Sequence, residues 1–113
     1  MHIDITPEAI LTQLGFTPSD NTVAQMERIM NNTNGFEKFA KHIFSLNDSL
    51  KHMHGFIAPS NSNDYLKIKS EEDVAKEIMD EFHETINHWA DKYKVTIEKV
   101  PGKETYYIIG TNH

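Results

Sequence analysis

Apolar residues recur at helical spacing in four segments of the chain, two short and two long. The short segments run from Thr6 to Gly15 and from about Asp20 to Asn32, and Thr6 and Gly15 are suitable residues to begin and end a helix. The third segment covers roughly residues 35–53. When successive residues are placed about 100° apart, one stripe contains Phe36, Phe39, Ala40, Ile43, Leu46, Leu50 and Met53. Each of these patterns predicts an amphipathic helix.

The fourth helix is predicted to begin at a capping box, Ser70-Glu71-Glu72-Asp73, and to run to about Tyr93. Its inner side carries Val74, Ile78, Phe82, Ile86, Trp89 and Tyr93. This apolar arc spans about 160°, which is wider than the roughly 100° that a helix buries against one neighbour. We therefore expect another subunit to cover part of it.

Alternating apolar and polar residues predict three strands. Residues 65–69 form the first, and residues 95–100 and 105–109 form a C-terminal hairpin around Pro101-Gly102. Residues 1–5 could add an edge strand. The fold class is α+β, with about four helices and a small antiparallel or mixed sheet of three strands.

The 113 residues suit a single domain, 1–113. Its helical part is predicted over residues 6–55 and its strand–helix–hairpin part over residues 65–110. Between them, residues 58–64 contain Pro59-Ser60-Asn61-Ser62-Asn63-Asp64, a composition typical of an exposed, flexible loop.

Cysteine is absent, which excludes disulfides, thiol nucleophiles and Cys-based zinc sites. The N-terminal residues do not resemble a signal peptide, and no stretch approaches the roughly 18 apolar residues of a membrane span. These features predict a cytoplasmic protein with no membrane partner.

The net charge of −6 is concentrated in one segment. Residues 70–93 hold eight acidic and two basic residues, whereas the remainder holds nine of each. An acidic face repels phosphate backbones, which argues against nucleic acid as a partner.

Seven histidines are the main hint of a metal site. His83 and His88 are five residues apart and so diverge by about 140° on a helix, whereas two ligands of one ion need a spacing of three or four. Asp80-x-x-His83 resembles half of a di-iron carboxylate motif. One hypothesis is therefore a metal-binding protein or metal-dependent enzyme that uses Asp80, His83, Glu84, His88 and His42. The other interpretation is a solvated acidic face with local pairs such as Glu84–His88.

The leading hypothesis is a small protein–protein interaction or homo-oligomeric accessory domain, for instance a homodimer, rather than an enzyme. No catalytic residue and no cofactor are predicted, since the glycines are isolated and no nucleophile motif occurs. The expected contact residues lie on the fourth helix: Trp89, Phe82, Glu77, Glu81 and Glu84.

A third hypothesis concerns the last strand. Tyr106 and Tyr107 alternate, so one of them is expected to face the core and the other the solvent. The exposed tyrosine could form a nucleic-acid-stacking face with Lys67, Lys69, Lys94 or Lys99. Alternatively, these lysines merely protect a half-buried sheet against aggregation.

Overall fold

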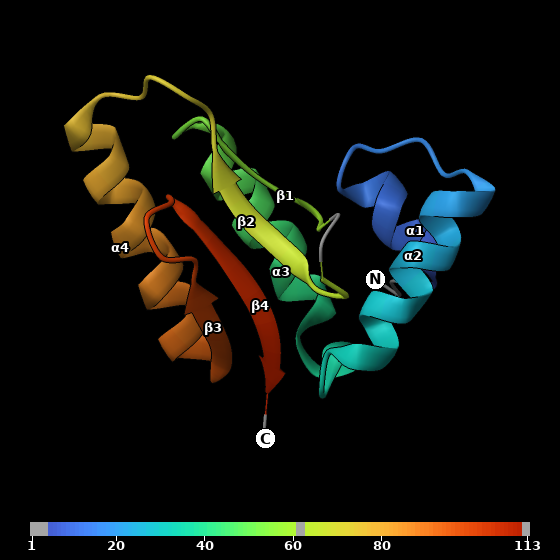
Figure 1. Cartoon of the computed structure of the whole chain (residues 1–113). Coiled ribbons are helices and arrows are strands. Elements are labelled where there is room, and N and C mark those ends of the chain that lie inside the picture. Colours follow the sequence, from blue (N-terminus) through green and yellow to red (C-terminus); the bar gives the residue numbers. More distant parts are fainter. Residues whose placement is uncertain (1–4, 61–62, 112–113) are drawn as a thin grey trace.

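A computed structural model describes residues 5–60 and 63–111 (Figure 1). Over these residues the fold is α+β, with four helices and a four-stranded antiparallel sheet. In chain order the elements are α1 (Pro7–Gln13), α2 (Asp20–Asn32), α3 (Phe36–Lys51), β1 (Gly55–Pro59), β2 (Leu66–Ser70), α4 (Lys76–Tyr93), β3 (Val95–Lys99) and β4 (Thr105–Thr111). None of the described helices combines the length and the hydropathy needed to cross a membrane.

The strand order is β1-β2-β4-β3, so β2 and β4 lie at the centre of the sheet. Ile68 of β2 lies opposite Ile57 of β1 on one side and opposite Tyr106 of β4 on the other. The predicted strands and the C-terminal hairpin are confirmed. The prediction of three strands is wrong by one, because β1 was not expected. Its five residues show no simple alternation, and the strand forms by pairing with β2.

Helices cover one face of this sheet. Figure 1 shows α3 behind β1 and β2, α4 alongside β3 and β4, and α1 and α2 beside β1. The strand residues that face α3 and α4 are buried, including Ile57, Ile68 and Ile108 at 0% exposure. Phe56 and Lys69 point to the opposite side and are exposed. No described helix lies on that side, which we call the open face.

Helix α4 begins later than the capping box predicts. Ser70 is the last residue of β2 and lies opposite Gly55, and the Glu71 amide donates to the His54 carbonyl at 2.8 Å. Strand pairing therefore extends through the predicted helix start. The helix begins at Lys76 with Ala75 as N-cap and no side-chain cap.

The helical part of the chain, expected to extend to residue 55, ends earlier. Helix α3 ends at Lys51, and Gly55 opens β1. A Cβ atom at this position would lie 2.7 Å from the Phe82 ring, so α4 packs directly on the glycine. The requirement for glycine here comes from tertiary packing rather than from helix termination.

The predicted flexible loop over residues 58–64 is also shorter than expected. Ala58 and Pro59 belong to β1, and Ser60 is buried, with its amide donating to the Tyr65 carbonyl at 3.0 Å. Residues 61–62 lie outside the described residues, as do residues 1–4 of the proposed N-terminal strand.

Candidate functional site

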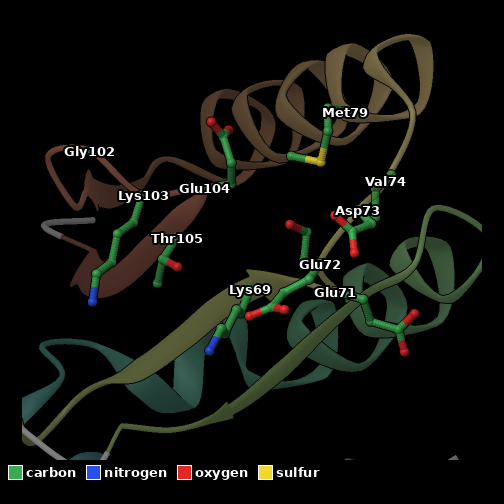
Figure 2. A pocket seen from close by; sticks show the side chains of 11 residues that line it. Lys69, Glu71, Glu72, Asp73, Val74, Met79, Gly102, Lys103, Glu104 and Thr105 are labelled. Atoms are coloured by element: carbon green, nitrogen blue, oxygen red, sulfur yellow. The ribbon is translucent and has the colours of Figure 1, made fainter.

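A cleft of about 630 Å³ lies where β2, the start of α4 and the β3–β4 loop meet (Figure 2). We call it the loop cleft; its lining residues are Lys69, Ser70, Glu71, Glu72, Asp73, Val74, Met79, Gly102, Lys103, Glu104 and Thr105. Its volume lies in the range of small-molecule pockets, about 300–1,000 Å³, but such pockets are mostly apolar. Four carboxylates and two lysines line the loop cleft, so it does not resemble one.

The charged side chains of the loop cleft point in different directions. Figure 2 shows Lys69 and Lys103 extending together away from α4, whereas Glu104 points toward the helix. The neighbouring loop residues Lys103 and Glu104 therefore point in different directions. The two lysines belong to the open face of the sheet.

A smaller hollow of about 140 Å³ adjoins the loop cleft on the open face. We call it the lysine hollow; it is lined by Ser60, Lys67, Lys69, Val100, Lys103, Thr105 and Tyr107. Lys69, Lys103 and Thr105 also line the loop cleft, so the two depressions are continuous. No carboxylate lines the lysine hollow.

Strand register brings the residues of the lysine hollow together. Lys67 lies opposite Tyr107, and Lys69 lies opposite Thr105. Because side chains alternate along a strand, all four point to the open face. Lys103 joins them from the β3–β4 loop. Backbone hydrogen bonds hold this loop in place; for example, the Val100 amide donates to the Thr105 carbonyl at 2.8 Å.

The three lysines of the hollow make no ion pair with a carboxylate of the described residues. Ion pairs between other described residues include Arg28–Asp64, Lys51–Asp48 and Lys76–Asp80, and the contacts His54–Glu71 and His83–Glu104 join imidazoles to carboxylates. Three neighbouring ammonium groups repel one another. The lysine hollow therefore favours an anion.

Aromatic side chains flank the lysine hollow. The rings of Tyr65 and Tyr107 lie 6.2 Å apart between centroids. Phe56 is 37% exposed and lies opposite Lys69 in the register of β1 and β2. The open face thus combines positive charge with apolar area that a partner could cover.

A separate cluster joins α4 to the β3–β4 loop. His83 Nδ1 is hydrogen-bonded to the Tyr106 hydroxyl at 2.6 Å, and its other ring nitrogen contacts the Glu104 carboxylate. Burial raises the pKa of the Tyr106 phenol and Glu104 raises it further, while a hydrogen bond to Asn87 partly offsets both effects. Tyr106 is only 5% exposed, and neither His83 nor Tyr106 lines the loop cleft or the lysine hollow. Of its members only Glu104 lines the loop cleft, so this cluster ties α4 to the β3–β4 loop at the edge of that cleft.

The residues of the metal hypothesis do not converge. Asp80 pairs with Lys76 at 2.8 Å, and His42 stacks on Tyr93 with ring centroids 3.8 Å apart. Glu84 and His88 are exposed. Over residues 5–60 and 63–111, no three His, Asp or Glu side chains are placed to hold a metal ion.

The expected contact residues of α4 divide into two groups. Phe82 is 0% exposed and Trp89 is 6% exposed, and the Trp89 indole N–H donates to the His42 carbonyl at 2.9 Å. The acidic residues, Glu77, Glu81 and Glu84, are exposed. The sheet and α3 therefore bury the two large aromatic side chains without a second subunit.

Tyr106 and Tyr107 divide as the alternation predicts, with Tyr106 buried and Tyr107 half-buried on the open face. Lys94 ends α4 as its C-cap, and the Lys99 ammonium donates to the Lys103 carbonyl, so neither lysine lines the hollow. The sequence gives no indication of Lys103, because its place depends on the path of the β3–β4 loop.

Comparison of the chain with protein-family models, with curated proteins and with solved structures finds no match. Function is therefore inferred from the surface of the molecule itself.

Proposed function

We propose that this protein is a small interaction domain that binds a negatively charged site of another protein on its open face. The observation that carries the proposal is the lysine hollow, which gathers three ammonium groups without a carboxylate partner among the described residues. A concentration of one charge of this kind attracts an oppositely charged surface of a partner.

The open face supports this proposal better than α4 does. The apolar side of α4 is occupied by its own core, and its outer side presents exposed carboxylates. Phe56, by contrast, is one of only two large hydrophobic residues that are exposed in the described part of the chain; the other is Phe16. A partner on the open face would bury apolar area and neutralise charge together.

The partner is proposed to be a different protein rather than a second copy. A two-fold dimer places the same surface of both subunits in contact. A two-fold axis through the lysine hollow would bring Lys67, Lys69 and Lys103 of one subunit toward the same lysines of the other, and like charges repel. We therefore expect a monomer in light scattering at micromolar concentration.

Phe16 and Phe56 allow a matched crosslinking test, because each is 37% exposed but only Phe56 lies on the open face. A photoreactive phenylalanine analogue placed at either position is irradiated in the cells that produce the protein. We expect a discrete crosslinked protein from position 56 and none from position 16. Mass spectrometry should place the crosslink beside acidic or phosphorylated residues of that protein.

Three outcomes would contradict the proposal. The first is the same set of products from both positions, and the second is no product from position 56. The third is a crosslink from position 56 to a second copy of this chain, which would indicate self-association instead.

A further inference from the structure

We propose that the lysine hollow binds a phosphoryl group carried by the partner protein. This inference rests on the function proposed above and adds the chemistry of the group that is recognised.

The size of the lysine hollow suits one chemical group rather than a whole small molecule. Its volume of about 140 Å³ is well below the roughly 300–1,000 Å³ of small-molecule pockets. Thr105, 8% exposed, forms part of its lining between the lysines. The hollow is therefore suited to the end of a side chain that projects from a larger partner.

The charge of the hollow matches a dianion better than a single carboxylate. All three lysines line the hollow, Lys67 and Lys69 from β2 and Lys103 from the β3–β4 loop. A phosphoryl group carries about −1.5 to −2 charges at pH 7 and has three strong acceptor oxygens. A carboxylate carries one charge on two oxygens and would leave two of the three lysines uncompensated.

The charge changes sign beyond the hollow. The loop cleft continues from Lys69 and Lys103 to Glu71, Glu72 and Asp73 (Figure 2). A segment that places its phosphoryl group in the hollow would extend past these carboxylates. We therefore expect the partner to carry lysine or arginine near the phosphorylated residue.

Three matched peptide pools test this inference with the full chain. The pools have random flanks and a central phosphoserine, glutamate or serine, and their binding is measured by fluorescence anisotropy. We expect the phosphoserine pool to bind at least tenfold more tightly than the glutamate pool, and the serine pool not to bind. Backbone amide signals of Lys69 and Thr105 should shift in NMR spectra when the phosphoserine pool is added.

Two triple variants with the same change in net charge provide the control. Lys67→Gln/Lys69→Gln/Lys103→Gln removes the charges of the hollow and should abolish binding of the phosphoserine pool. Lys41→Gln/Lys51→Gln/Lys92→Gln removes three exposed charges from α3 and α4 and should leave binding within about twofold. Thr105→Val, which keeps every charge, should weaken binding by several-fold.

Equal binding of the phosphoserine and glutamate pools would overturn the inference while leaving the proposed function intact, because crosslinking from position 56 tests that function independently. Equal loss in both triple variants would show nonspecific attraction and would also overturn it. Binding of inorganic phosphate as tight as that of the phosphoserine pool would show that the peptide contributes nothing, and it would overturn the inference that a partner protein carries the group. Tighter binding of a 12-nucleotide oligouridine would indicate a nucleic-acid site and contradict both proposals.

Discussion

At Gly110 the last strand passes so close to residue 34 that a side chain has no room. The backbone φ angle is 143°, and a Cβ atom would lie 2.7 Å from both the amide nitrogen and the carbonyl oxygen of Asn34. Thr111, next in the chain, donates its amide to the Asn34 carbonyl at 2.8 Å. This glycine therefore allows β4 to pack against the chain just before α3.

Gly110→Ala should destabilise the fold by about 3 kcal/mol, because backbone strain and a clash with backbone atoms add. Urea denaturation measures the loss. Gly102→Ala is the matched control, since Gly102 also has a positive φ angle of 75° but has no atom within 4 Å of the added Cβ. It should cost only about 1 kcal/mol, from strain alone. Equal losses of stability in Gly110→Ala and Gly102→Ala would contradict the close packing of Gly110 against Asn34.

His42 lies between α3 and α4, where its ring stacks on Tyr93. Burial, followed by the charges of Lys41 and Lys92, lowers the pKa of this imidazole below its ordinary value of about 6.5. The unfolded chain therefore binds this proton more readily than the folded chain does. The contribution of His42 to stability is complete above pH 6.5 and falls as the pH drops below it.

The free energy of unfolding of the parent and of His42→Gln, measured by denaturation at pH 7.5 and pH 5, tests this contribution. The parent should lose more stability on acidification than His42→Gln does. In Lys92→Gln the His42 pKa, followed by NMR, should rise, because one repelling charge is gone. A His42 pKa at or above 6.5 in the folded parent would contradict the burial of this ring.

At the scale of elements, Asn47 connects α3 to the edge of the sheet. Its side chain is 3% exposed, and its Oδ1 accepts a hydrogen bond from the Ile57 amide of β1 at 3.0 Å. That amide points away from β2, so the bond satisfies a donor at the edge strand. The same hydrogen bond prevents another strand from pairing with the Ile57 amide.

Asn47→Ala should destabilise the protein by about 1–3 kcal/mol, because the Ile57 amide loses its acceptor in a buried position. Ser49→Ala, an exposed change on the same helix, should alter stability by less than about 0.5 kcal/mol. Hydrogen exchange at the Ile57 amide should accelerate in the first variant and not in the second. Unchanged protection of that amide in Asn47→Ala would refute the assignment.

The elements that the sequence predicts well are those whose signals are local. The stripe from Phe36 to Met53 and the alternation around Ile68 are visible in the chain itself. Strand β1 and the delayed start of α4 are not, because Gly55 and Ser70 obtain their structure by pairing with each other. A capping box at Ser70 is a sound local prediction that a long-range strand pair overrides.

At the scale of the whole molecule, the sheet separates two charged surfaces. Helix α4 bears exposed carboxylates on the side that holds the helices, and the lysine hollow lies on the open face. The sequence locates the acidic segment, since residues 70–93 account for the whole net charge of −6. It cannot locate the hollow, because Lys69 and Thr105 meet only through the pairing of β2 with β4.

The open face, rather than α4, is the surface proposed to bind the partner. Matched charge reversals on the two surfaces test it through the crosslink from position 56. Lys67→Glu/Lys69→Glu should abolish that crosslink, whereas Glu77→Lys/Glu81→Lys should leave its yield unchanged. Loss of the crosslink in the α4 variant, with its retention in the β2 variant, would contradict the account.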